Sequence, residues 1–260
     1  MPETSHIARW HELQWCLHGP DLLAHSGLPL FRWPASQRAA HETLPPTPEP
    51  LHHRLGRRFE QHWQHAFTQL PGWTVLGAGI QIQSAGRTLG ELDLLVTSEG
   101  EVWHLELAVK FYLCAPGHSG DILSDWIGPN GRDRLDRKLA RMRDHQLPLG
   151  QSDPARDTLQ ALGLPAPTRS AAVLNGIRFS HWQAPHSDVA GRWCSVRDLP
   201  AAVPEGRVLS RPEWLGHAPT AQDDWQSGPA LLHAVAIAGR RGPAQLVDPS
   251  GVRWLAMPGQ

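Results

Sequence analysis

Residues 88–113 (TLGELDLLVTSEGEVWHLELAVKFYL) constrain the fold more than any other part of the chain, because two apolar-rich runs flank a short turn. From Val102 to Phe111 large apolar residues recur at every second position, starting at Trp103, and residues 90–97 are interpreted in the same way. A period of two residues is typical of a β-strand. A turn over residues 98–101 therefore predicts an antiparallel hairpin that pairs Thr97 with Val102.

This register brings acidic residues together. It places Asp93 opposite Glu106 and Glu91 opposite Ala108, and opposed residues have Cβ atoms about 4.5–5.5 Å apart. Carboxylates at that separation repel unless a divalent cation or a shifted protonation state compensates. Because Mg²⁺ favours one or two carboxylates with water and phosphate, the pattern indicates a metal site, with Lys110 available to orient water or neutralise phosphate charge. The alternative is a solvated strand face that carries a Glu–Lys pair.

Four segments together resemble a known family. They are GELDLLV at residues 90–96, VWHLELAVKFYL at 102–113, LGRRFEQHW at 55–63 and WIGPNGRDRLDRK at 126–138. They are similar to the bacterial domain of unknown function 1853 family, which is grouped with the PD-(D/E)XK nuclease-like superfamily. The resemblance extends from HELQWCLHGPDLL near the start to RWLAMP at the end, and it is most specific at HLELAVKFYL.

The resemblance implies an α/β fold with a restriction-endonuclease-like core, in which helices flank a central mixed sheet. A single domain is expected over residues 1–260, with its core at about 50–200. An N-terminal helical extension would cover residues 1–49, and a C-terminal elaboration would cover 201–260.

The resemblance also implies a site. Glu60 would be the acidic residue of the first core helix, Asp93 the metal-binding aspartate and Lys110 the lysine of the final motif. The family's usual carboxylate lies two residues before this lysine, where this chain has Ala108. Glu106 or Glu91 could supply the missing ligand. The expected catalytic residues are therefore Glu60, Asp93, Glu106 and Lys110, and the expected ligands of Mg²⁺ or Mn²⁺ are Asp93, Glu106 and Glu91.

These residues predict a metal-dependent nuclease that hydrolyses nucleic-acid phosphodiester bonds. The alternative is a catalytically inactive nuclease-like module that binds nucleic acid or a protein partner, and a third interpretation is a structural polar network. Since the 260-residue chain has a formal net charge of −1, any phosphate-binding surface must be local. A predicted helix over 132–145 presents such a cationic face, although it could also be an ordinary charged helix with Asp–Arg pairs.

The cysteines and histidines show neither the pattern of a disulfide framework nor that of a zinc site. The three cysteines, Cys16, Cys114 and Cys194, are far apart and odd in number, so we expect buried free thiols. The histidines at 52–53, 62 and 65 form no recognisable ligand set and are expected at the surface or partly packed. With neither a membrane-length apolar run nor a signal-peptide core, the chain is expected in the cytoplasm.

The remaining pattern predicts the order of the other elements. Two short helices over 7–24, broken at residues 19–21, precede an irregular segment over 26–50. A helix over 50–69, two strands at 73–76 and 79–83, the hairpin and the helix over 132–145 follow. A connector over 148–169, strands at 170–179 and 192–196, and a late strand at 245–247 complete the expectation.

Overall fold

A computed structural model describes residues 2–23, 26–216 and 224–258. The chain divides into two compact units: one comprises Met1–Val109 with Leu139–Asn175, and the other comprises Lys110–Lys138 with Gly176–Gln260. Three elements have residues in both units, namely β3 (Glu101–Cys114), α4 (Leu135–Arg141) and β5 (Arg169–His181). The fold is mixed α/β, with a large central mixed sheet flanked by helices, which confirms the predicted fold class at this level.

The first unit carries the predicted hairpin. Its strands are hydrogen-bonded in the order β1-β2-β3-β5, and the pairs β1/β2 and β2/β3 are antiparallel. The other elements of this unit are α1 (Pro2–His18), η1 (Ala35–Gln37), α2 (Arg38–Glu42), α3 (Leu55–Gln69), β1 (Thr74–Ser84), β2 (Arg87–Ser98), the π-helical η3 (Met142–Gln146), α5 (Leu147–Leu149) and α6 (Asp153–Ala161).

The β2–β3 hairpin has the predicted register. Thr97 pairs with Val102 and Ser98 with Glu101, and the two residues between them have φ values of 52° (Glu99) and 81° (Gly100). Positive φ at both central positions is the requirement of the tight turns that suit twisted antiparallel strands. The register is therefore fixed by local turn geometry together with the alternation on both sides.

The first strand differs from the prediction. Residues 73–76 and 79–83 were expected to form two strands, but β1 is one strand with an irregularity in its pairing between Val75 and Gly77. A bulge lets one strand bend and twist without ending its ladder. The glycines at 77 and 79 signal such a bulge as well as they signal a break, which explains the error.

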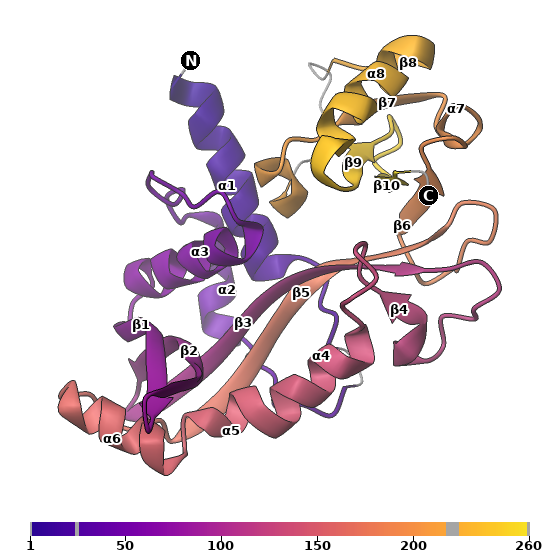
Figure 1. Ribbon diagram of the computed structural model, residues 1–260. Helices are drawn as coiled ribbons and strands as arrows, with labels where there is room; N and C mark the ends of the chain where they lie inside the picture. Colours follow the sequence, from indigo (N-terminus) through magenta and orange to yellow (C-terminus); the bar gives the residue numbers. More distant parts are fainter. Residues whose placement is uncertain (1, 24–25, 217–223, 259–260) are drawn as a thin grey trace. The chain divides into compact units, whose positions relative to one another are not determined.

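Helix α3 packs one face into an aromatic cluster. Phe59, Trp63 and Phe67 are buried on this face, and Phe31 and Trp33 of the preceding irregular segment contact the same rings. Figure 1 shows α3 beside α1 and close to β1 and β2. The predicted irregular segment over 26–50 thus covers the core, although it also contains η1 and α2.

Two predictions for helices were wrong. The chain from Asp21 to Leu23 was expected to begin a second helix, but Asp21 forms a β-bridge with Asn175, and its Oδ1 accepts the amide of Leu23 at 2.7 Å. Residues 148–169 were expected to be a connector without a helix, but they contain α6, whose N-cap Ser152 accepts a hydrogen bond from the amide of Ala155. The Ser-Asp-Pro sequence is a helix-start signal that the prediction overlooked.

The second unit has its own core. From β5 its strands follow the order β6 (Gly191–Ser195), β10 (Arg253–Met257), β9 (Ala244–Val247), β7 (Glu205–Val208) and β8 (Gln226–Ser227), and β4 (Trp126–Ile127) pairs with β3. The pairs β5/β6 and β6/β10 are parallel. Its helical segments are η2 (Leu123–Asp125), α7 (Leu199–Ala202), η4 (Pro212–Leu215), α8 (Gly228–Ala238) and η5 (Gly239–Arg241).

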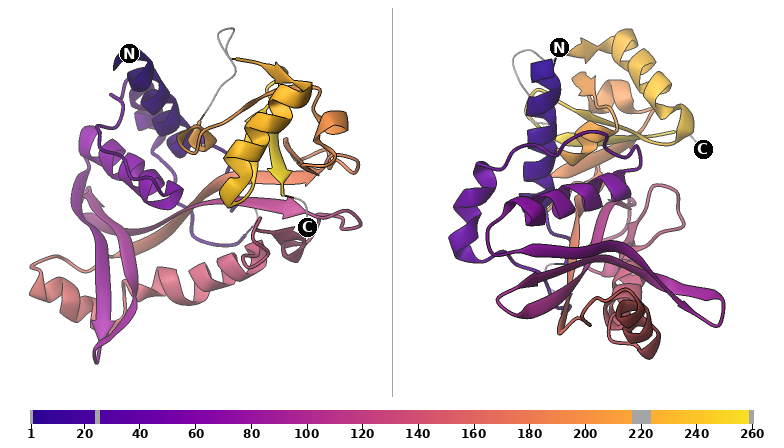
Figure 2. Two further views of the ribbon diagram at one scale, coloured as in Figure 1. Left: turned by 45° about the horizontal axis from the view of Figure 1, so that its top comes forward. Right: turned by 90° about the vertical axis from the view of Figure 1, so that its left-hand side faces the viewer.

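Helix α8 covers the C-terminal strands of this unit. Leu231 and Val235 of the helix are buried in one cluster with Ala244 and Leu246 of β9, and Figure 2 shows the helix alongside these strands. The predicted late strand is confirmed as β9, whereas β10 was missed, although the Asp-Pro-Ser-Gly turn before it is a typical hairpin signal. No helix in the described parts of the chain is long and apolar enough to span a membrane.

Candidate functional site

Asp93 and Glu106 lie where the β2–β3 pairing ends. The paired residues run from Ser98 with Glu101 to Leu94 with Leu105, and Asp93 and Glu106 are the next residue on each strand. The Asp93 carboxylate reaches across to β3, because its Oδ2 accepts the amide N–H of Leu107 at 2.9 Å. The hairpin therefore holds the carboxylate of Asp93 beside the backbone of Leu107, the residue that follows Glu106.

Glu106 is buried, with 2% of its surface exposed. Its Oε1 accepts a hydrogen bond from Nε2 of Gln146, the last residue of η3. A buried carboxylate is stabilised by such donors, which partly replace the water that it has lost. The sequence analysis did not include Gln146, which approaches β3 from a segment 40 residues further along the chain, and no local pattern marks it.

Glu60 and Glu91 are joined by one arginine. Nη1 of Arg57 lies 2.7 Å from Oε2 of Glu60 and 2.6 Å from Oε1 of Glu91, and Nη2 lies 3.1 Å from Oε2 of Glu91. The hydrogen bonds to Glu91, followed by those to Glu60, raise the pKa of Arg57. Burial raises the pKa of Glu60, although the hydrogen bond from Arg57 opposes the change. The three-residue spacing of Arg57 and Glu60 on one helix is a signal that could have found this pair.

Lys110 belongs to the second unit, where it pairs with an aspartate. Its Nζ lies 2.6 Å from Oδ2 of Asp133, and the two side chains are 36% and 30% exposed. Tyr112 is fully buried, and burial, followed by the charge of Asp133, raises the pKa of its hydroxyl. The sequence analysis considered the aspartates of the predicted helix over 132–145 only as partners for its arginines, so the contact of Asp133 with Lys110 was missed.

The predicted basic helix begins later than expected. Helix α4 starts at Leu135, and the buried side chains of Leu135, Leu139 and Met142 confirm which face points inward. Arg134 forms two hydrogen bonds with Asp136, at 2.6 and 2.8 Å, which lower the pKa of the Asp136 carboxyl. The alternative of an ordinary charged helix with Asp–Arg pairs therefore has such a pair, between residues two positions apart.

A buried network around His62 was also missed. This histidine was expected at the surface or partly packed, but it is fully buried, with Nδ1 2.7 Å from Oγ1 of Thr47 and Nε2 3.2 Å from Oε2 of Glu12. Burial lowers the pKa of His62, so the neutral ring can donate from Nε2 and accept at Nδ1. Arg58 donates two hydrogen bonds to the same glutamate. The three cysteines are buried and free, as predicted.

The donors at the end of the hairpin suit a hard divalent cation. No group of three or more histidine, cysteine, aspartate or glutamate side chains that could hold a metal is found among the described residues. Mg²⁺ needs only one or two carboxylates when water and substrate phosphate complete its octahedral shell. Asp93 and Glu106, on neighbouring strands and each with an anchoring hydrogen bond, meet that requirement.

Comparison with known proteins places the chain in a family. The model of the family described as domain of unknown function (DUF1853) matches residues 11–248, so the chain belongs to this family. No curated protein and no solved structure matches the chain.

Proposed function

We propose that this protein is a divalent-metal-dependent phosphodiesterase of the PD-(D/E)XK nuclease-like type, acting on nucleic acid. The observation that carries the proposal is the placement of Asp93 and Glu106 at the end of the β2–β3 ladder. The order of elements supports it, since α3, β1, β2 and β3 follow one another as the resemblance requires of the core.

Asp93 and Glu106 would hold Mg²⁺ or Mn²⁺. Such an ion polarises a phosphoryl oxygen and lowers the pKa of its bound water. The protein contributes orientation: the Leu107 amide fixes the Asp93 carboxylate, and Gln146 fixes that of Glu106. Partners of this kind hold ligands in place and tune their basicity, and their loss typically weakens metal affinity or activity by about 10- to 100-fold.

The roles of Lys110 and Glu60 in this proposal come from the family motif. Lys110 follows Glu106 by four residues in β3 and would assist the attacking water. Its ammonium group is paired with Asp133, so Lys110 would have to leave this ion pair to reach the attacking water. Glu60, held by Arg57, would act from α3.

The proposal is tested by cleavage of single- and double-stranded DNA and RNA with Mg²⁺ or Mn²⁺. The wild type should cleave at least one substrate, Glu106→Gln should abolish cleavage, and Gln146→Ala should reduce it by about 10- to 100-fold. Glu101→Gln is the matched control, because it removes a partly exposed carboxylate at the other end of the same strand, where its partner is Arg169. Failure of the wild type on every substrate, together with calorimetry that detects no metal binding, would contradict the proposal.

A second candidate function is nucleic-acid or protein binding without hydrolysis. The observation that favours it is the Lys110–Asp133 ion pair, because the lysine charge is then balanced within the protein. In that case Glu106→Gln should leave the binding of nucleic acid unchanged in a filter-binding assay, and added Mg²⁺ should change neither affinity nor melting temperature. A loss of metal-dependent stabilisation in Glu106→Gln would exclude this alternative.

A further inference from the structure

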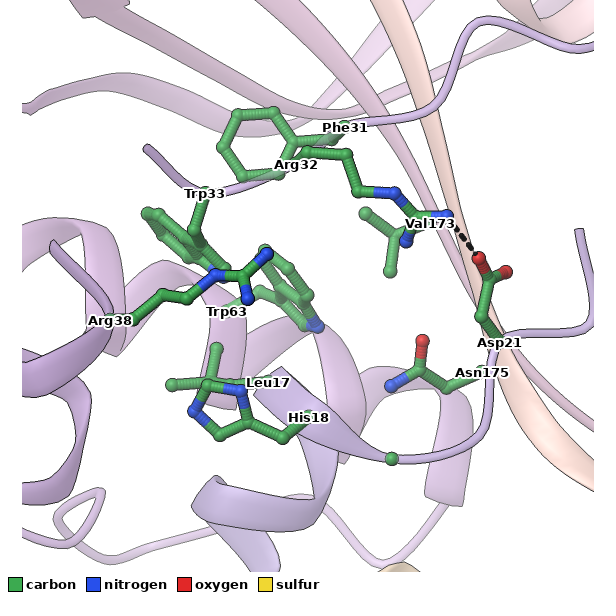
Figure 3. A pocket seen from close by; sticks show the side chains of 11 residues that line it. Leu17, His18, Asp21, Phe31, Arg32, Trp33, Arg38, Trp63, Val173 and Asn175 are labelled. Carbon is green, nitrogen blue, oxygen red and sulfur yellow. Dashed lines mark hydrogen bonds and ion pairs between the residues drawn. The ribbon is translucent and has the colours of Figure 1, made fainter. Parts of the chain in front are cut away.

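The first unit contains a cavity of about 250 Å³ away from the hairpin carboxylates. Figure 3 shows that it is lined by the end of α1, the segment from Phe31 to Arg38, α3 and β5. Leu17, Trp33, Trp63 and Val173 provide apolar walls. The function proposed above does not use any of these side chains.

A buried donor faces this cavity. Trp63 is 3% exposed, and its indole Nε1 has no hydrogen-bond acceptor among the described residues. In Figure 3 the indole nitrogen of Trp63 lies on the side of the ring that faces Asn175, within the space that the side chains enclose. Trp33 stacks against Trp63 with ring centroids 5.3 Å apart and planes 5° apart, so the ring is held in this orientation. A buried donor without an acceptor is costly, which makes it a strong hydrogen-bond site for a ligand.

The charges that line the cavity are mainly positive. Arg38 lines it and forms no ion pair with any of the residues that the structure describes. Arg32 also lines it, and its Nη2 is paired with Oδ2 of Asp21 at 2.7 Å. His18 also lines the cavity, but burial and the nearby charge of Arg38 lower the pKa of its imidazole, and its Nε2 lies 3.2 Å from Nδ1 of His41, so it adds no positive charge. A ligand in the cavity therefore meets an uncompensated guanidinium and a buried N–H donor.

We propose that this cavity binds a phosphate monoester, with Arg38 and the Trp63 indole N–H as its principal donors. A guanidinium matches phosphate geometry because it presents paired N–H donors to two oxygens. The volume is below the 300–1,000 Å³ that is usual for drug-sized ligands, so it admits a phosphate with the sugar or ring that carries it rather than a longer segment. The monoester could come from a free nucleotide or from the terminal phosphate of a nucleic-acid strand.

The test follows the indole N–H resonance of Trp63 in the intact protein by nuclear magnetic resonance. Trp63→Phe identifies this signal among those of the 12 tryptophans by its absence. The wild type is titrated with inorganic phosphate, adenosine monophosphate and a short oligonucleotide with or without a 5′-phosphate, in buffer containing a metal chelator. The signal should move saturably with adenosine monophosphate or with the phosphorylated strand, and not with the strand that lacks the phosphate. Of adenosine monophosphate and the phosphorylated strand, the ligand that binds more tightly identifies the source of the phosphate monoester.

Arg38→Gln should weaken binding at least 10-fold, because a charge-assisted hydrogen bond contributes about that much or more. Arg87→Gln is the matched control, since it removes an exposed arginine of the same unit, outside the cavity. Equal loss in both variants, or no movement of the Trp63 signal at millimolar ligand, would overturn the proposal. A shift with inorganic phosphate alone would reduce it to a site for an adventitious ion only. Since the chelator prevents metal-dependent cleavage, this result is independent of the proposed nuclease activity.

Discussion

Asp93 has an observed structural contact and a proposed role as a metal ligand, and two substitutions distinguish them. Its carboxylate accepts the Leu107 amide, and Leu107 is 4% exposed, so this amide has little access to water. Asp93→Ala removes the acceptor, whereas Asp93→Asn keeps a side-chain oxygen in its place and removes only the charge. The first substitution should therefore affect folding and metal binding, and the second only metal binding.

The magnitude follows from the lost hydrogen bond. A buried amide left without its acceptor costs about 1–3 kcal/mol, so Asp93→Ala should lower the free energy of unfolding by that amount. For a chain of 150–250 residues, 1 kcal/mol corresponds to roughly 2–4 °C in melting temperature. Asp93→Ala should thus melt several degrees below the wild type, and Asp93→Asn within about 2 °C of it.

Thermal melting followed by circular dichroism, with and without Mn²⁺, measures both effects. Mn²⁺ should raise the melting temperature of the wild type, because a ligand that binds only the folded state stabilises it. Neither variant should respond to the ion or cleave nucleic acid. If Asp93→Asn melts as low as Asp93→Ala, the hydrogen bond to Leu107 does not account for the stability, and if Asp93→Asn keeps full metal-dependent cleavage, Asp93 is not a metal ligand.

Three further predictions concern single side chains. Glu12→Ala should cost about 3–5 kcal/mol in denaturant unfolding, because it leaves the largely buried Arg58 guanidinium without its carboxylate; adding Arg58→Ala should recover part of the loss, and strict additivity would argue against the pair. Burial lowers the pKa of His104 to about 4, below its unfolded value near 6.5. Stability should therefore be full above pH 6.5 and fall as the pH drops towards 4, and His104→Leu should flatten this slope; an unchanged slope would contradict the assignment. Lys110→Ala should change stability by less than about 1 kcal/mol, because its ion pair is partly exposed, yet abolish any metal-dependent cleavage.

The sequence predicted the hairpin well because its determinants are local. The two-residue turn with positive φ at Glu99 and Gly100 and the alternation of both strands agree on one register. The inward face of the helix after Leu135 was predicted for the same reason, since Leu135, Leu139 and Met142 recur at helical spacing. Where the turn residues and the side-chain pattern agree, the register of strands and the buried face of a helix can be predicted from sequence alone.

The contacts of the site could not be predicted in the same way. Gln146 reaches Glu106 over 40 residues of chain, and Arg57 reaches Glu91 over 34. His62 was expected at the surface or partly packed, because nothing near it in the sequence indicates that Glu12 and Thr47 approach it. Hydrogen bonds between distant segments depend on tertiary packing, which local periodicity does not encode.

These contacts also distinguish the carboxylates that were expected to bind metal. Both oxygens of Glu91 accept hydrogen bonds from Arg57, a full positive charge, so a cation could bind Glu91 only by displacing that guanidinium. The hydrogen bonds to Asp93 and Glu106 described above come from a backbone amide and a side-chain amide, which are neutral. Neutral donors orient a carboxylate without cancelling its charge. The arrangement therefore argues against Glu91 as a metal ligand, and it assigns Arg57 to balancing the charges of Glu60 and Glu91.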